Sequence, residues 1–189
     1  MTIPARYTRT AAILHWLIAL LMVLNILLGV GANHVPDGWV RPMIDSHKSI
    51  GLTVLGLAVL RLLWRLSHPA PKLPETYARW ERLTAHGVHV ALYVWIFALP
   101  ITGWLHDSAW SQAATHPLRL FGVVPWFRFG FIEDLDPAVK EPLHAVLGTV
   151  HFWFGYLLYG LFALHVAGAL KHQWIDGERE LQRINPFGR

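Results

Sequence analysis

Four long apolar segments dominate the hydrophobic pattern of the chain. They cover approximately residues 11–30, 44–66, 85–105 and 143–170, and polar segments with Pro, Gly and charged residues separate them. Each is long enough for an α-helix that crosses the roughly 30 Å hydrocarbon core of a bilayer. The pattern predicts an all-α fold, an integral membrane four-helix bundle that comprises the whole chain, residues 1–189, as a single domain.

The first apolar segment could also be read as a signal peptide, because basic residues precede it and small residues follow it. Its apolar core is longer than that of a typical signal sequence, and it contains His15, for which a discarded segment would have no use. We therefore predict that it is the first transmembrane helix.

The polar segments differ in length and composition. Residues 106–142 are rich in Trp and Phe and form the longest predicted connection, which we expect to lie on the membrane surface as a partly ordered cap. Residues 171–189 are predicted to be a polar tail. Within the third helix, the sequence Leu99-Pro100-Ile101-Thr102-Gly103 should produce a bend, because proline lacks a backbone donor.

Basic residues are distributed unevenly across the predicted topology. Of the sixteen Lys and Arg residues, eleven fall on the side of the N-terminus and five on the opposite side. Because cytoplasmic loops carry the excess of basic residues, this distribution predicts that both termini are cytoplasmic and that the long connection lies outside. It also accounts for the net charge of +4, which we do not interpret as nucleic-acid binding.

The composition excludes several kinds of redox centre. The chain contains no cysteine, so it cannot form disulfides, bind a cysteine-ligated iron–sulfur cluster or attach a c-type haem covalently. Its ten tryptophans suit a protein with two membrane interfaces.

Histidines are the informative residues of the fourth apolar segment, which contains no Asp, Glu, Lys or Arg between residues 143 and 170 but carries His144, His151 and His165. His151 and His165 are fourteen residues apart, so they leave nearly the same helix face at depths that differ by about 21 Å. An ionisable side chain within a membrane is by default a functional candidate.

Histidines on the other helices match these two depths. His15 should lie at the depth of His165 near the cytoplasmic side, and His47 at that of His151 near the outer side. A haem iron takes one axial ligand on each face of an apolar ring, and facing helices of a bundle can supply both. We predict two b-type haems with these four histidines as iron ligands, although depth alone would allow His144 in place of His151.

Zinc is a poorer interpretation, because a tetrahedral site needs its ligands close together and these histidines form two layers. Other histidines are less informative. His86 and His89 begin the third helix, and we interpret them as structural or propionate-contacting residues. Loop histidines are assigned no role; these are His34, His68, His106 and His116.

Small and basic residues near the candidate ligands could serve the same cofactors. Gly51 follows His47 by one helical turn, and glycine allows a macrocycle to approach the helix backbone. Similar glycines lie near the fourth-helix histidines, namely Gly148, Gly155 and Gly168, and packing between helices explains each of them equally well. Arg61 is a candidate for holding haem propionates, whereas Arg65 fits a topology-fixing charge.

These motifs together resemble the prokaryotic cytochrome b561 family, which is related to the cytochrome b subunits of membrane hydrogenases and formate dehydrogenases. The resemblance extends over essentially the whole chain. It rests on His15-Trp16, His47-Lys48-Ser49-Ile50-Gly51, Leu63-Trp64-Arg65, the Leu-Pro-x-x-Gly of the third helix, and His151 with His165.

The resemblance implies a multi-pass protein of the bacterial inner membrane with two haem b groups. It implies that His15 and His165 bind the cytoplasmic-side haem and that His47 and His151, rather than His144, bind the periplasmic-side one. Family members pass electrons between a periplasmic partner and membrane quinone.

One branch of the family resembles a superoxide:ubiquinone oxidoreductase, and there a histidine at the position of His172 lies by the quinone. Lys48 is the candidate for guiding anionic superoxide. The alternative is an anchor subunit of a larger redox complex. A proton or ion path is disfavoured because the interiors of the spans lack acidic residues.

Overall fold

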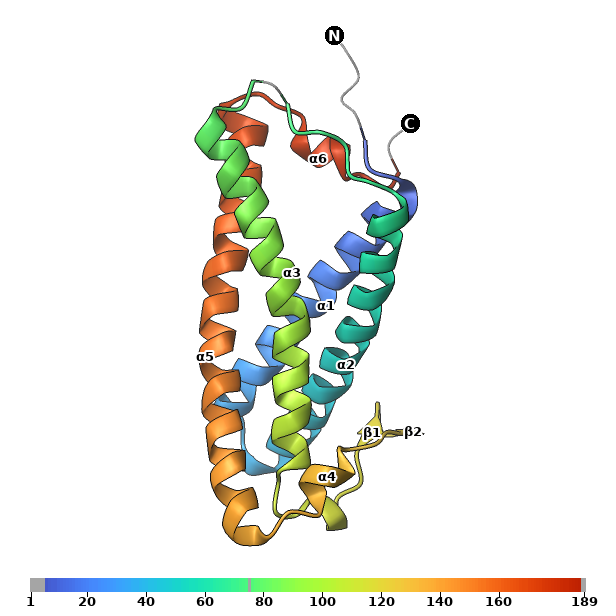
Figure 1. The fold of residues 1–189 in the computed structure, drawn as a ribbon, viewed down its shortest axis with the longest axis vertical. Coiled ribbons are helices and arrows are strands. Elements are labelled where there is room, and N and C mark those ends of the chain that lie inside the picture. Colours follow the sequence, from blue (N-terminus) through green and yellow to red (C-terminus); the bar gives the residue numbers. More distant parts are fainter. Residues whose placement is uncertain (1–5, 75, 188–189) are drawn as a thin grey trace.

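The computed structural model describes residues 6–74 and 76–187 and shows an antiparallel bundle of four long helices (Figure 1). These are α1 (Arg9–Gly31), α2 (Asp37–Ser67), α3 (Arg79–Ser108) and α5 (Pro137–Leu170). In the described chain, all four are long and apolar enough to span a membrane. The predicted all-α four-helix membrane fold is confirmed. We call the end where α1 begins and α5 ends the inner end, and the opposite end the outer end.

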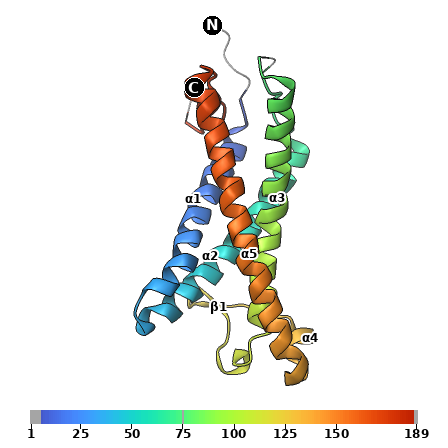
Figure 2. The same ribbon diagram turned by 90° about the vertical axis from the view of Figure 1, so that its left-hand side faces the viewer.

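The four helices form two closely packed pairs. α1 packs along α2, α3 packs along α5, and contacts between α2 and α3 join the pairs. Towards the outer end, α1 and α2 lean away from α3 and α5 (Figure 2). Large apolar side chains point outward, as at Leu20, which is 66% exposed. That surface is the one that lipid would cover.

Three helices extend beyond the apolar segments that predicted them. α2 begins at Asp37 rather than near residue 44, α3 covers Arg79–Ser108 rather than 85–105, and α5 begins at Pro137 rather than near residue 143. The apolar pattern locates only the part of a helix that lipid covers. Proline at the first position of α5, after the N-cap Asp136, begins that helix before its apolar stretch. His106 therefore belongs to α3 and not to a loop.

The outer connection is more ordered than the partly ordered cap that we predicted. It contains the short 3-10 helix η2 (Ala113–Thr115), an antiparallel hairpin of β1 (Arg119–Leu120) and β2 (Val124–Pro125), and α4 (Gly130–Glu133). Trp104 donates its indole N–H to the carbonyl of Phe127, 2.8 Å away, and the amide of Phe129 donates to the hydroxyl of Ser108. These bonds hold the connection against the end of α3.

The predicted polar tail also folds against the bundle. α5 continues into the π-helical turn η3 (Lys171–Ile175), and the short helix α6 (Glu180–Arg183) follows. Arg183 donates to the carbonyls of Pro71 and Lys72 in the α2–α3 connection, and Trp16 donates its indole N–H to the carbonyl of Ile184. The segment therefore covers the inner end. One further short element, the 3-10 helix η1 (Ala32–His34), joins α1 to α2.

Candidate functional site

Two pairs of histidines face each other across the bundle, one near each end. The ring centres of His47 on α2 and His151 on α5 are 6.1 Å apart at the outer end. Those of His15 on α1 and His165 on α5 are also 6.1 Å apart at the inner end. The structure thus brings together the histidines that the depth argument paired.

The separation within each pair suits two imidazoles that share one metal ion. A ring nitrogen lies about 1 Å from the ring centre and a metal–imidazole bond is about 2 Å long, so two rings on opposite sides of one ion have centres about 6 Å apart. Both pairs meet this condition. The two donor sets therefore fit the b-type haem that the resemblance implies, one at each level of the bundle.

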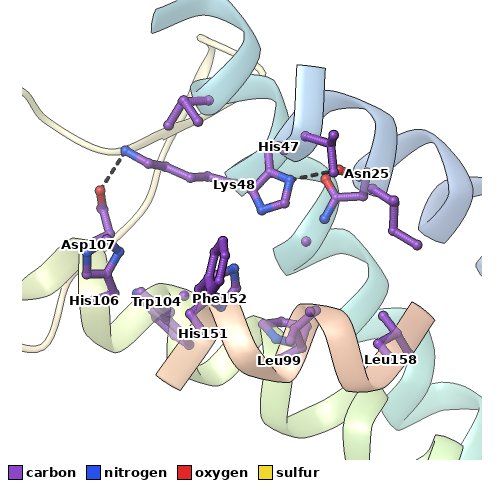
Figure 3. A pocket seen from close by; sticks show the side chains of 18 of the residues that line it. Asn25, His47, Lys48, Leu99, Trp104, His106, Asp107, His151, Phe152 and Leu158 are labelled. Carbon is purple, nitrogen blue, oxygen red and sulfur yellow. Dashed lines mark hydrogen bonds and ion pairs between the residues drawn. The ribbon is translucent and has the colours of Figure 1, made fainter. Parts of the chain in front are cut away.

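At the outer site, the backbone of α1 orients His47. Its Nδ1–H donates to the carbonyl oxygen of Asn25, 2.9 Å away, which leaves Nε2 as the nitrogen with a free lone pair (Figure 3). The ring also lies against Gly29, where a Cβ atom would come within 2.9 Å of Cε1 of His47. A metal-binding histidine commonly has such a partner for its other nitrogen.

α3 orients His151 in the same way, through a hydrogen bond and a glycine contact. The hydroxyl of Thr102 donates to the carbonyl of Leu99, so its oxygen accepts the Nδ1–H of His151 at 3.1 Å. A Cβ atom on Gly103 would lie 2.9 Å from Cε1 of His151. Each outer histidine thus packs against a glycine of the neighbouring helix and has its Nε2 free.

A cavity of about 860 Å³ contains the outer pair. Its walls come from all four long helices, and mostly apolar side chains such as Leu99, Phe152 and Leu158 line it (Figure 3). The volume lies at the upper end of the range for ligand sites. Asn25 also lines this cavity, and its buried Oδ1 has no hydrogen-bond partner among the residues that the structure describes. Size and lining both suit a large flat apolar ring.

His144, the competitor of His151, has a different neighbour. Its ring stacks on that of His106, with centres 4.1 Å apart and planes 28° apart. The nitrogen lone pairs of an imidazole lie in the plane of its ring, so two stacked rings do not point their lone pairs at each other. This arrangement does not suit ligands on opposite sides of one ion. Both rings line the cavity. Gly148 makes room for this pair, since a Cβ there would lie 3.0 Å from Nε2 of His106.

The predicted small residues have mixed surroundings. Gly51 lines the cavity opposite the side-chain amide of Asn25, and Gly155 is buried in the wall. Gly168 has open space where a Cβ would lie. Among the described residues, no ring contact joins His34, His68, His86 or His116 to another histidine, whereas His106 stacks on His144.

At the inner site, a third imidazole joins the pair. The ring of His89 on α3 lies 5.2 Å from that of His165, with planes 69° apart. Arg61 lies within electrostatic range of both His15 and His165, and it donates from Nη1 to the carbonyl of Ala11 at 2.8 Å. The inner pair therefore has cationic and ionisable neighbours, whereas each outer histidine packs against a glycine.

His172 lies in a polar network beyond the inner pair. Its Nδ1–H donates to Asp176 at 2.6 Å, and its ring stacks on Tyr77 with centres 4.0 Å apart. The ammonium of Lys171 contacts both Asp176 and Glu81. The hydrogen bond from Lys171 lowers the pKa of Asp176, so this carboxylate stays ionised and accepts from His172. Glu81, His172 and Asp176 could hold a metal ion by spacing, but the ammonium of Lys171 already pairs with both carboxylates.

Lys48 has an ion-pair partner that the sequence did not indicate. Its ammonium lies 2.6 Å from Asp107 (Figure 3). The other carboxylate oxygen of Asp107 accepts from the buried Arg128 at 2.7 Å. Lys48 is thus compensated by a buried carboxylate, and this weakens its predicted role in guiding an anion. The network instead connects α2, α3 and the outer connection.

The structure adds site residues that sequence reasoning missed. These are Asn25, Gly29, Thr102 and Gly103, which orient or accommodate the outer histidines. Gly103 belongs to the Leu-Pro-x-x-Gly motif, so part of the signal was present but was interpreted as a bend. Asn25 contributes a backbone carbonyl, which leaves no signature in a sequence.

The helical-bundle fold, with histidines paired at two levels, indicates a class, the membrane cytochromes. Comparison with known proteins gives the family: its profile, described as prokaryotic cytochrome b561, matches residues 6–186. The chain belongs to this family of membrane electron-transfer proteins of bacteria, which implies b-type haem.

Three curated relatives extend along nearly the whole chain. Cytochrome b561 homolog 2 of Escherichia coli K12 is 33% identical over 183 residues, 96% of this chain and 92% of that protein. Cytochrome b561 homolog 1 of the same organism is 23% identical and covers 96% and 97%. A protein of Yersinia pestis described as probable superoxide oxidase CybB is 25% identical over 92% of each chain.

Proposed function

We propose that the chain is a cytochrome with two haem b groups that carries electrons across the bacterial inner membrane, between the periplasmic face and the quinone pool. One observation carries the proposal: two histidine pairs, each with ring centres 6.1 Å apart, lie at different levels of one apolar bundle. Haem bound between such imidazoles supplies a one-electron carrier at each level.

The protein's own residues prepare the outer ligands for this task. The carbonyl of Asn25 and the hydroxyl of Thr102 accept the Nδ1–H groups, so both Nε2 atoms would be available to a haem iron without a change of tautomer. The apolar cavity wall excludes water from the carrier.

His172 is our candidate for the contact with ubiquinone at the inner end. It follows His165 by seven residues, which places it about 10 Å further along the same helix. The π-helical turn that carries it is a form of helix often found at functional sites. Its bond to the ionised Asp176 keeps the proton on Nδ1 and leaves Nε2 to face a ligand.

The enzymatic form of this function is a superoxide:ubiquinone oxidoreductase. Two superoxide anions would each give up one electron at the outer face and become dioxygen, and the two electrons with two protons would reduce ubiquinone to ubiquinol. The name of the Yersinia pestis relative supports this form.

Haem content is the first test. We expect the purified chain to contain about two haem b groups in a pyridine haemochrome assay, as two bis-histidine pairs require. A reversible reduced-minus-oxidised spectrum should accompany them. A colourless protein, or one with a single haem after expression with ample haem supply, would contradict the proposal.

Turnover tests the donor and the acceptor. We expect superoxide to reduce the haems rapidly and a ubiquinone analogue to reoxidise them. His172→Phe should slow reoxidation without changing the haem spectrum, and His86→Phe, at an exposed histidine near the same end, is the matched control. Co-purification of a redox subunit, together with no turnover of the isolated chain, would favour the anchor-subunit alternative.

A further inference from the structure

The outer hairpin carries a continuous apolar surface that belongs to neither histidine pair. Residues 120–127, with the sequence LFGVVPWF, contain no charged side chain, and arginines flank them on both sides. Phe121 is 62% exposed, Val123 73% and Phe127 58%. Apolar surface gathered in this way on an extramembrane segment indicates an interaction site.

The tip of the hairpin is held in a defined position on α2. The amide of Phe121 donates to the hydroxyl of Ser49 at 2.9 Å, and this serine is 1% exposed. Phe121 has a φ of 51°, a left-handed conformation that a bulky residue adopts only at a cost. The bond to Ser49 compensates for that cost, so the apolar tip is a fixed feature of the fold.

The contact with Ser49 also gives the depth of the tip. From Ser49 inward, α2 carries no charged residue until Arg61, and Arg65 lies sixteen residues away, or about 24 Å along the helix axis. The hydrocarbon core of a bilayer is about 30 Å thick. A membrane whose inner boundary lies near Arg65 therefore reaches the level of Phe121, and the hairpin stands beside α2 at that level (Figure 1).

We propose that the hairpin tip, residues 121–124, inserts into the outer lipid leaflet and anchors the outer connection to the membrane. β1 contacts α2, so the exposed apolar tip lies next to a membrane-spanning helix. Arg119 is exposed at the base of the hairpin, where its charge can remain among the phosphate groups. Lipid, rather than a soluble partner, is the occupant that this depth favours.

The absence of cysteine from the chain makes the test direct. Val123→Cys is labelled with an environment-sensitive fluorophore in the haem-loaded protein, which is reconstituted in phosphatidylcholine vesicles. Gln112→Cys, at an exposed position of the same connection, is the water-facing control. Leu20→Cys, on the outward face of α1, is the lipid-facing control.

We expect the label at residue 123 to be quenched several-fold more strongly than the label at 112 by lipids with a shallow nitroxide, and several-fold less by aqueous iodide. The haem spectrum shows that each variant is folded, and Val124→Cys repeats the measurement if Val123→Cys loses haem. A label at 123 that behaves like the one at 112 overturns the proposal. If that label were protected only in native membranes, a protein partner would be the occupant.

Discussion

The two histidine pairs have the same ring separation but different surroundings. At the outer pair, neighbouring helices fix each imidazole through a hydrogen bond to Nδ1 and a glycine against the ring. At the inner pair, a third imidazole and a guanidinium lie close by, and a separate polar network around His172 follows further along the chain. The outer histidines are therefore held in a fixed geometry, whereas the inner pair lies next to charged and ionisable groups.

This difference suits the two ends of an electron path. A rigid apolar site accepts and passes on an electron with little rearrangement. A site next to ionisable groups can couple electron transfer to proton transfer. Reduction of a quinone requires both. The following predictions test the comparison, beginning with the largest effect.

Loss of a ligand should remove one haem and spare the other. We expect His15→Ala and His165→Ala to lose the same haem, and His47→Ala and His151→Ala to lose the other one, as resolved by redox titration of the haem spectrum. His89→Ala is the control and should retain both haems. Loss of the inner haem in that variant, with retention in His15→Ala, would make His89 the ligand instead.

The glycine contacts distinguish the outer site from the inner one. In Gly29→Ala or Gly103→Ala, the new methyl group would overlap the imidazole of His47 or His151, so haem content should fall from about two towards one per chain. The matched control is Gly160→Ala, at a helical position with nothing near the new Cβ. It should be neutral or slightly stabilising, because alanine is the better helix former. Equal haem loss in all three variants would show a general packing effect.

Thr102→Val removes the hydrogen-bond partner of His151 while keeping its shape. Loss of an outer-shell partner of this kind typically weakens metal binding about 10–100-fold, so the outer haem should dissociate more readily to an apo-myoglobin acceptor. Thr53→Val, a helical threonine bonded only to its own helix, is a suitable comparison. An unchanged rate would mean that the hydroxyl does not orient the ligand.

Arg61→Gln should change the inner haem alone. A positive charge near a haem favours its reduced form, so removing that charge should lower the inner midpoint potential by an amount on the order of tens of millivolts. The outer potential should stay constant. A shift of both potentials, or of the outer one only, would contradict the assignment of Arg61 to the inner site.

Much of this architecture could be predicted from the sequence, because the length and hydrophobicity of a segment indicate a membrane helix. The depth of each histidine followed from the rise of a helix, and the structure brings His15 to His165 and His47 to His151. The role of these four residues as haem ligands stays a prediction. The cytoplasmic position of both termini also stays a prediction. The partners of the outer histidines lie on other helices, and the carbonyl of Asn25 carries no side-chain signal.

The segments outside the membrane were harder to predict. The hairpin at residues 119–125 depends on a bond from Phe121 to Ser49, more than seventy residues earlier, and the fold of the C-terminal segment depends on contacts of Arg183 with Pro71 and Lys72. Such long-range bonds do not appear in local periodicity. For the same reason, the pairing of Lys48 with Asp107 was missed.

α5 carries one member of each histidine pair, so a single uninterrupted helix determines how far apart the two sites lie. Inserting or deleting one residue between His151 and His165 would rotate one imidazole by about 100° relative to the other and shift it by about 1.5 Å. Every descendant of this protein that keeps both sites must therefore keep that interval close to a whole number of turns. The backbone of α5 therefore sets the distance that an electron travels between the two sites. Substitutions elsewhere can change the reduction potentials of the sites but not this distance.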